Sequence, residues 1–230
     1  MAPSVTAKTP VLSVRAHIGD AKTLLAWDLL DTTNVGRLAG FTIQCEPHGR
    51  DPYYLHNMLR FRAPGDHAQD PQESAYSTIN APIHKFRWLH VPGSVHQGLK
   101  PVMGKYAYTV TARFFDENRS LQPLDTQFSV SVTVQVKPFE KGELKLGFTR
   151  GFTQSQAFVR HFGLKARIRP DSDQLMFDTS EIAGSDATGT RYSYSDEYEW
   201  SGSTARERIF ELVSERDVIP LDERARGWEA

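Results

Sequence analysis

Apolar and polar residues alternate over several stretches in the first 136 residues of the chain. In residues 12–18 the apolar side chains fall on every second position, and residues 25–29 repeat the pattern after the turn-forming pair Gly19-Asp20. A period of two places alternate side chains on opposite faces of a strand, so each stretch is predicted to be a β-strand with one buried face. The short polar connection predicts that the two strands form an antiparallel hairpin.

Three more stretches show the same alternation further along the chain. Residues 41–45 form a third predicted strand, and the clearest strands span 106–114 and 128–136. A sheet with one apolar face must pack that face against another layer, so an antiparallel sandwich of two sheets is the predicted architecture. The residues that we expect in its core include Trp27, Phe41, Tyr108, Val110, Val130 and Val132.

The order of these features resembles a fibronectin type III domain over residues 10–138. The matching features are Trp27 on the second strand, Gly40-Phe41 at the start of the third, and the alternation of residues 106–112 on the sixth. The resemblance implies a mainly β fold, an antiparallel fibronectin III/immunoglobulin-like sandwich. It also implies a tyrosine corner made by Tyr106 or Tyr108; the alternative is that both tyrosines simply pack in the core.

The chain departs from the fibronectin pattern between Pro47 and Pro82. This insertion carries short apolar groups and a polar run from Gly65 to Ser77. A long insertion in a sandwich usually lies at an edge or over one face, so we expect the same here.

The pattern changes after Pro138. Residues 144–148 are predicted to form one more strand, and residues 153–163 a short helix. Thr153 with Gln156 forms a capping box, and Gly163 suits the left-handed residue that follows a helix. Together with the segment that follows, these elements predict a small α+β junction region over residues 139–215.

A second helix is predicted from Thr204 to Glu215, after a polar and turn-rich segment from Ser172 to Thr204. Thr204 with Glu207 provides the start signal, and four apolar residues share one face at helical spacing. These residues are Ala205, Ile209, Leu212 and Val213. Residues 216–230 are charged and interrupted by proline, so we expect a frayed tail there.

The segment Gly147-Phe148-Thr149-Arg150-Gly151-Phe152 resembles the junction in a group of bacterial phospholipase D-like proteins. In that group a fibronectin-like domain precedes the segment, and an aromatic-rich stretch follows before the phosphodiesterase body. The matching stretch here is Glu197–Arg206. The resemblance implies that the chain is the N-terminal portion of a phospholipase D-like phosphodiesterase, with residues 139–215 leading into a truncated catalytic domain.

The catalytic motif of that group is absent. Phospholipase D-like catalysis uses H-x-K-x4-D, in which histidine attacks phosphorus and lysine binds the phosphate oxygens. Eight histidines occur in the chain, and none has lysine two positions later. We therefore assign no catalytic residue and expect the chain alone to be inactive, with a hydrolase of unrecognised chemistry as an alternative.

No cofactor or metal ligand is assigned either. His84, His90 and His96 recur every six residues, but Pro92 and Gly93 interrupt them and no cysteine or carboxylate completes a usual metal set. No glycine-rich phosphate loop of the Walker type is present. Cys45, on a predicted core strand, is expected to be a buried thiol rather than a reactive one.

Composition narrows the class of protein further. The formal net charge is −1 over 230 residues, so the chain as a whole has no electrostatic attraction to nucleic acid or to an anionic membrane. The single cysteine fits a reducing compartment. Because neither a signal peptide nor a run of about 20 apolar residues is visible, we expect a cytoplasmic protein.

Two clusters of side chains remain open to interpretation. Positive residues gather around the first predicted helix and negative residues from Asp178 to Glu199, so the two segments either neutralise each other or are solvated separately. The positive residues are Arg150, Arg160, His161, Lys165, Arg167 and Arg169. Four aromatic residues are interleaved with acids, and aromatics without neighbouring cations are poor nucleic-acid platforms. These residues, Tyr192, Tyr194, Tyr198 and Trp200, are expected to cover the sandwich or to await a partner.

The sequence therefore supports a binding or scaffold role in a phospholipase D-like protein. The rival hypothesis is a stand-alone protein-interaction module. Its surface would be the insertion from Pro47 to Pro82 and the helix from Thr204 to Glu215. That helix is the expected site of a protein partner or of self-association, because its apolar stripe needs a cover.

Overall fold

The computed structural model describes residues 4–92, 97, 102–147, 156–172, 177–186 and 188–217. Of residues 156, 157, 160, 204 and 212–217 it describes only the backbone. The chain divides into two compact units. One comprises residues 1–91 and 102–137, and the other comprises residues 92–101 and 138–230. Each unit is described by itself.

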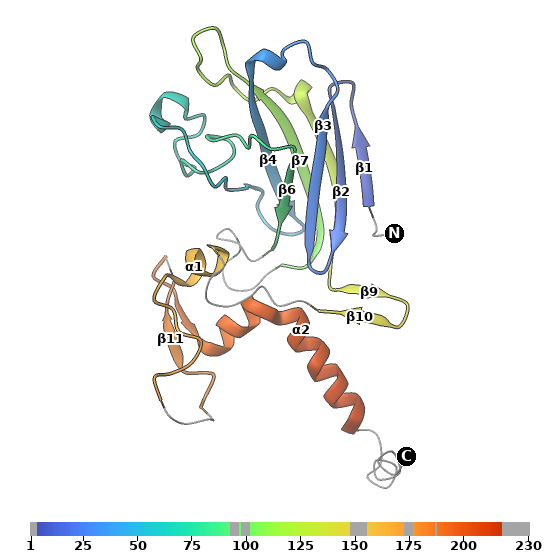
Figure 1. The fold of residues 1–230 in the computed structure, drawn as a ribbon, viewed down its shortest axis with the longest axis vertical. Helices are drawn as coiled ribbons and strands as arrows, with labels where there is room; N and C mark the ends of the chain where they lie inside the picture. The colour runs from blue at the N-terminus through green and yellow to red at the C-terminus, as the bar shows by residue number, and fades with distance from the viewer. Residues whose placement is uncertain are drawn as a thin grey trace. The chain divides into compact units, whose positions relative to one another are not determined.

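The first unit contains two four-stranded antiparallel sheets (Figure 1). Sheet 1 has the order β1 (Ser4–Lys8), β2 (Leu12–Gly19), β3 (Lys22–Leu29) and β6 (Arg87–His90). Sheet 2 has the order β5 (Tyr53–Tyr54), β4 (Leu38–Pro47), β7 (Gly104–Phe114) and β8 (Ser129–Val136). This arrangement confirms the predicted mainly β, antiparallel sandwich. Strand β1 was not predicted, because its side chains are mostly exposed and give no apolar alternation.

Buried side chains from both sheets form one core between them. All six residues predicted for the core are buried. The rings of Trp27 on β3 and Phe41 on β4 meet edge to face across the two sheets, with centroids 5.4 Å apart. The alternation of apolar residues therefore identified the inner faces correctly, because only those faces are removed from water.

Tyr106 makes the expected tyrosine corner. Its hydroxyl donates a hydrogen bond of 2.6 Å to the carbonyl oxygen of Val102, four residues upstream. The hydroxyl of Tyr108 instead lies 2.7 Å from Nδ1 of His90 on β6, so this second tyrosine links the two sheets within the core. Of the two residues that the sequence left open, Tyr106 takes the corner.

The insertion after β4 is fastened to the sandwich by a buried cation. The guanidinium of Arg113 donates to the hydroxyl of Thr42 at 2.8 Å, to the carbonyl of Ile79 at 3.2 Å and to the carbonyl of Gln122 at 2.7 Å. Burial lowers the pKa of Arg113 to about 10. Because these bonds replace the water that a buried cation loses, residue 79 of the insertion is held against β4 and β7.

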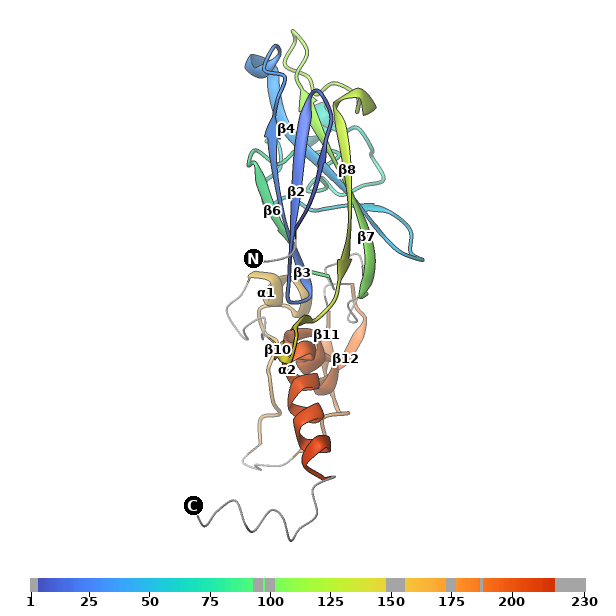
Figure 2. The same ribbon diagram turned by 90° about the vertical axis from the view of Figure 1, so that its right-hand side faces the viewer.

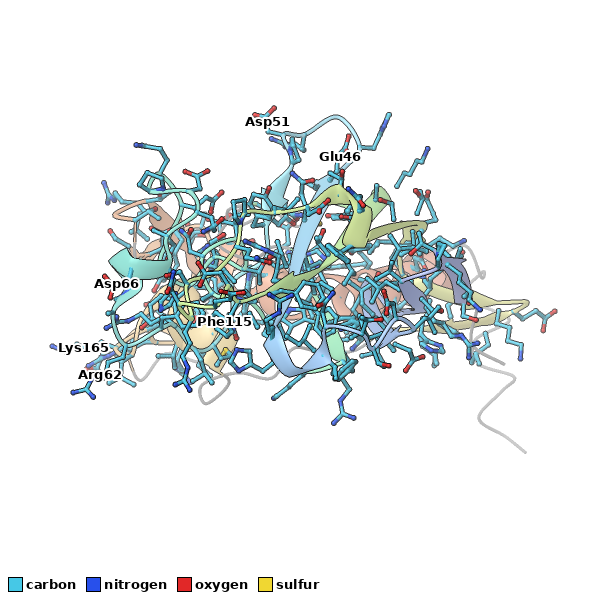
Figure 3. The ribbon with its side chains drawn as sticks, turned by 90° about the horizontal axis from the view of Figure 1, so that it is seen from above. Glu46, Asp51, Arg62, Asp66, Phe115 and Lys165 are labelled. Carbon is cyan, nitrogen blue, oxygen red and sulfur yellow. The ribbon has the colours of Figure 1, made fainter. Side chains whose placement is uncertain are left out.

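Other charged side chains of the insertion point outward. Figure 3 shows Arg62 and Asp66 projecting from the rim of the insertion, and both are exposed. Phe115, just after β7, contacts Phe61 and His67 with ring centroids 6.0 and 6.1 Å away. The insertion therefore exposes charged side chains at its rim and makes an aromatic contact with the end of β7.

The second unit contains two hairpins and two helices (Figures 1 and 2). Its elements are β9 (Phe139–Lys141), β10 (Leu144–Leu146), α1 (Gln156–Phe162), β11 (Ile182–Ser185), β12 (Arg191–Ser193) and α2 (Tyr194–Asp217). The predicted small α+β region is confirmed. Gly163 follows α1 at φ +91°, as expected for the residue beyond a helix end. Thr153 of the predicted capping box lies outside the described residues.

The prediction of a turn-rich segment up to Thr204 is wrong at its end. Helix α2 begins ten residues earlier, and its cap is formed by Ser193 and Asp196. The backbone N–H of Asp196 donates to the Ser193 hydroxyl at 3.2 Å, and the N–H of Ser193 donates to the Asp196 carboxylate at 2.9 Å. The helical backbone is interrupted at Gly202 (φ −164°, ψ 39°), which divides α2 into two helices, and the helix predicted from Thr204 corresponds to the second of them.

Two of the four aromatic residues of this region, Tyr192 and Trp200, belong to a hydrophobic core of their own unit. Tyr192, Tyr194 and Trp200 are buried, and the ring of Phe162 on α1 meets Tyr192 at 4.7 Å and Trp200 at 5.3 Å. Tyr198 is partly exposed and donates its hydroxyl to the carbonyl of Ile168. Among the described residues no helix is long and apolar enough to span a membrane.

Candidate functional site

The outer face of sheet 1 carries a row of three paired residues, and the middle one is small. The register pairs Arg15 of β2 with Ala26 of β3, and Ala26 with Arg87 of β6. Directly paired residues share one face of a sheet, and Trp27 and Val14 occupy the opposite, buried face. The small methyl group of Ala26 therefore lies between two arginines, which leaves room above it.

A hollow of about 670 Å³ lies over this row. Its volume falls within the range of about 300–1,000 Å³ that is usual for ligand sites. The lining comes from β2, β3 and the segment leading into β6, which adjoin one another in sheet 1 (Figure 1). The lining residues are Ser13, Arg15, His17, Ala26, Trp27, Asp28, Lys85, Phe86 and Arg87.

The rim at Lys85 and Phe86 is positioned by a segment that crosses from sheet 2 to sheet 1. Ile83 exchanges two backbone hydrogen bonds with Phe41 of β4, at 2.9 and 2.8 Å. Three residues later, the carbonyl of Phe86 accepts a hydrogen bond of 3.0 Å from the backbone N–H of Trp27 on β3. The segment is thus bound at both ends, and this attachment holds Lys85 at the rim of the hollow.

Gly40 makes the first of these attachments possible. Its φ is +129°, and a Cβ atom placed there would lie 2.7 Å from the carbonyl oxygen of Ile83. A side chain at this position would be strained in its backbone and would clash with a neighbouring backbone atom. The glycine that marks the start of the third strand in the sequence is therefore needed for the crossing.

Phe86 stands between two cations in the chain, but its ring points away from them. Its side chain is 47% exposed and meets the ring of Phe41 in the core edge to face at 5.0 Å. The backbone of Phe86 is hydrogen-bonded to that of Trp27, whose side chain is on the buried face, whereas Lys85 and Arg87 are exposed. Because side chains alternate along an extended chain, the ring of Phe86 lies on the inner side of sheet 1, and Arg87 lies on the outer side with Arg15.

The hollow has a positive charge balance. Arg15, Lys85 and Arg87 face Asp28, which is the one carboxylate among the residues that line the hollow. Within the part of the chain that the structure describes, no carboxylate lies within ion-pair distance of these three cations. Arg15 Nε donates to the Thr6 hydroxyl at 3.3 Å, which orients its guanidinium. Such a site suits an anionic group.

The same hollow is poorly arranged for nucleophilic catalysis. Ser13 and His17 both line it, but they are four residues apart on one strand, which separates their α-carbons by about 13 Å. A serine nucleophile needs its base within hydrogen-bond reach. The chemistry that the hollow supports is therefore binding.

The residues weighed in the sequence as chemical candidates lie elsewhere. Cys45 is fully buried in the sandwich core, and burial raises the pKa of its thiol to about 12, so the thiol is protonated at neutral pH. His90 is buried, with its ring nitrogens 2.7 Å from the Tyr108 hydroxyl and 3.3 Å from that of Tyr53. His96 lies outside the described residues. No three described His, Cys, Asp or Glu side chains are grouped to hold a metal.

Several positive side chains around α1 are already in contact with neighbouring residues. Arg167 pairs with Asp171 at 2.8 Å, and Arg169 donates to the carbonyl of Ser172 at 3.0 Å. His161 is buried and stacks on Trp200, with centroids 5.1 Å apart and ring planes 8° from parallel. Lys165 is exposed, whereas Arg150 and the side chain of Arg160 lie outside the described part. This segment offers a weaker anion site than the hollow on sheet 1.

Sequence reasoning missed the hollow, although one signal was present. The tripeptide Lys85-Phe86-Arg87 places two cations at alternate positions. The contribution of Arg15 could not be seen, because its position beside Arg87 depends on the pairing of β3 with both β2 and β6. The pairing register brings together residues that are 72 positions apart in the chain.

One buried acid in the second unit titrates unusually. The side chain of Glu197 on α2 is fully buried, and neither carboxylate oxygen has a hydrogen-bond partner among the described residues. Burial raises the pKa of Glu197 from 4.5 to about 7. The folded state therefore holds this proton more tightly than the unfolded state does.

We expect the stability of the second unit to fall as the pH rises between about 4.5 and 7. Over that interval the folded state binds more protons at Glu197, so its advantage is complete below 4.5 and lost above 7. Glu197→Gln should flatten this dependence, whereas Glu207→Gln on the exposed part of α2 should leave it intact. Thermal unfolding across this pH range measures the effect, and a wild-type profile that Glu197→Gln does not alter would contradict it.

In comparisons with known proteins, no family model matches the chain, and no curated protein matches it. The likeness to phospholipase D-like proteins therefore rests on the two sequence segments alone. The function must be argued from the geometry of the hollow and from the chemistry of the residues around it.

Proposed function

We propose that the chain is a non-catalytic binding module, and that the hollow on sheet 1 holds an anionic group of the phosphate type. The observation that carries the proposal is a set of three cations, Arg15, Lys85 and Arg87, that line the hollow from separate parts of the chain and have no carboxylate partner among the described residues. Arginine guanidinium groups bind phosphate with two parallel hydrogen bonds, and lysine adds a point charge.

The proposal extends to the place of the chain in a larger protein. We interpret it as the N-terminal portion of a phospholipase D-like phosphodiesterase, in which the sandwich binds or positions a ligand for a catalytic body. The support is the junction segment at residues 147–152 together with the aromatic-rich stretch Glu197–Arg206. A site for phosphate-bearing ligands fits a protein family that acts on phosphodiesters. We place the protein in the cytoplasm, because the use of a single cysteine in 230 residues is typical of a reducing compartment.

The binding proposal predicts that inorganic tripolyphosphate binds the chain, as measured by isothermal titration calorimetry at low ionic strength. Arg87→Gln should weaken binding about tenfold, because a charge-assisted hydrogen bond contributes on the order of 1.5–3 kcal/mol. Arg50→Gln removes the same charge from an exposed residue that does not line the hollow and should have little effect. Equal losses from both variants, or no binding by the wild type, would contradict the proposal.

A second candidate function is a protein-interaction module that uses α2. The side chain of Ile209 is 63% exposed, and Phe210 is exposed beneath the guanidinium of Arg206, which lies 5.3 Å from its ring centroid. Arg208 pairs with Glu140 of β9 at 3.1 Å, so the opposite side of α2 is attached to the β9–β10 hairpin. The side chains of Leu212 and Val213 lie outside the described part of the helix.

This second candidate predicts self-association through the exposed residues of α2. Sedimentation velocity at high protein concentration should then show a dimer for the wild type and a monomer for Ile209→Glu, since a buried charge at the contact destabilises it. If the wild type and the variant both sediment as monomers, α2 is not a self-association surface.

A further inference from the structure

We infer that the free edge of sheet 1 at β6 is a docking site for an extended peptide with acidic side chains, which adds one more strand to the sheet. This inference goes beyond the proposed anion site, because it uses main-chain groups at the edge of the sheet rather than the hollow above it. Its support is the direction in which the main-chain groups of β6 point, the exposed apolar side chains on both of its faces, and the cations beside it.

The main-chain groups of Arg87 and Leu89 point away from sheet 1. β6 is the last strand of the sheet and pairs only with β3. The carbonyl of Phe86 accepts a hydrogen bond from Trp27 on β3, and in an antiparallel pair such residues alternate with residues whose main-chain groups face outward. Arg87 and Leu89 are the outward-facing ones, and no described residue outside the sheet forms a hydrogen bond with them. The edge therefore offers two donors and two acceptors to a further strand.

Large apolar side chains are exposed on both faces of this edge. Leu89 pairs with Leu24 on the outer face and is 53% exposed. Phe86 is 47% exposed on the inner side, and Trp88, on the same side, is only partly buried against the core. Neighbouring strands lie about 4.8 Å apart, which brings their side chains into contact. An added strand would therefore cover apolar surface on both faces.

The other edge strands of the two sheets do not combine these features. β8, at one edge of sheet 2, has buried valines that alternate with serine, threonine and glutamine. β5, at the other edge, has two residues, and β1 carries one exposed large apolar residue, Val5. Cations and a short length often protect an edge strand from pairing, but protection gives no reason to expose Phe86 and Leu89 there.

The cations beside the edge indicate an acidic partner. Lys85 and Arg87 lie on the outer side of this edge, and Arg15 lies in the same row as Arg87. None of the three has a carboxylate partner among the described residues. A second copy of the chain, paired through its own β6, would bring the same cations together, and like charges opposite each other destabilise a sheet. A strand with carboxylates at these positions would instead neutralise them.

These positions specify a sequence pattern for the partner. In an antiparallel pairing, like the others in this sheet, apolar residues belong opposite Leu89, Trp88 and Phe86. Acidic residues belong opposite Arg87 and Lys85. The blocked peptide Thr-Val-Ile-Glu-Val-Glu-Thr meets this pattern when its first valine lies opposite Leu89. Its first valine and first glutamate then direct their main-chain groups toward β6, and the isoleucine and second valine direct theirs away.

The test uses fluorescence anisotropy titrations of the intact chain with this peptide and with two methylated forms of it. The unmethylated peptide should bind in a saturable manner. Methyl groups on the amide nitrogens of the first valine and first glutamate remove donors that face β6, so they should weaken binding about tenfold. Methyl groups on the isoleucine and second valine face solvent and should change binding little. A form with lysine in place of both glutamates should not bind.

A pair of variants tests the same hydrogen bonds from the side of the chain. Leu89→Pro removes an outward N–H and no bond to β3, and proline is tolerated on an edge strand in this orientation. It should weaken peptide binding about tenfold more than Leu89→Ala, which loses the leucine side chain but keeps the N–H. Both variants should bind tripolyphosphate like the wild type, because Leu89 does not line the hollow.

The outcomes separate this inference from the proposed function. No binding of the peptide, equal binding of its two methylated forms, or equal losses from the two Leu89 variants would contradict strand addition, whether or not tripolyphosphate binds. Tight binding of the lysine form would contradict an acidic partner. If the wild type sediments as a dimer and Leu89→Pro as a monomer, the edge holds a second copy and the inference is wrong. Should Leu89→Pro not fold by circular dichroism, the methylated peptides decide on the wild-type chain.

Discussion

The backbone hydrogen bonds that bind residues 83–86 to both sheets are the constraint on which the candidate site depends. Ile83 pairs with Phe41 in sheet 2, and Phe86 accepts from Trp27 in sheet 1. Between these two points the chain must cross the edge of the sandwich, and it does so against Gly40, where a Cβ atom would lie 2.7 Å from the Ile83 carbonyl. Without that close approach Lys85 would have no fixed position at the rim of the hollow.

The insertion that precedes residues 83–86 is held by a buried charged side chain. Arg113 is a fully buried cation that donates to one hydroxyl and two carbonyl oxygens. Burying a charge without hydrogen bonds is strongly unfavourable, so these bonds are required once the guanidinium lies inside. Because one of the carbonyls belongs to Ile79, the network fixes the chain four residues before Ile83. The rigidity of the hollow therefore begins in the interior of the sandwich.

Much of the sandwich could be predicted from the sequence, because its strands alternate strictly and face water on one side only. The six expected core residues are buried, and the corner tyrosine is Tyr106. The helix predicted from Thr204 corresponds to the part of α2 beyond Gly202, but the part before Gly202 was missed, because two start signals occur in succession. Ser193 with Asp196 caps the helix, whereas Thr204 with Glu207 follows the interruption at Gly202. Local sequence patterns alone do not show at which of these signals a helix begins, because the burial of Tyr194 and Trp200 also stabilises the helix.

The candidate site was beyond sequence reasoning for a related reason. Its cationic rim is contiguous in the chain, but its opposite wall, Arg15, reaches it only through two strand pairings. Glu197 could not be recognised either, because a glutamate in a polar segment gives no sign of complete burial. In both cases the deciding information is which residues the fold removes from water or places side by side.

The most direct test of the account is to locate the bound ligand by nuclear magnetic resonance. In a ¹H–¹⁵N titration with inorganic tripolyphosphate, the amide signals of Arg15, Ala26, Phe86 and Arg87 should shift in a saturable manner, while those of β7 and β8 in sheet 2 should stay in place. Shifts confined to sheet 2 or to the second unit, with Arg15 and Phe86 unaffected, would contradict the claim that the crossing segment and sheet 1 together form the binding site.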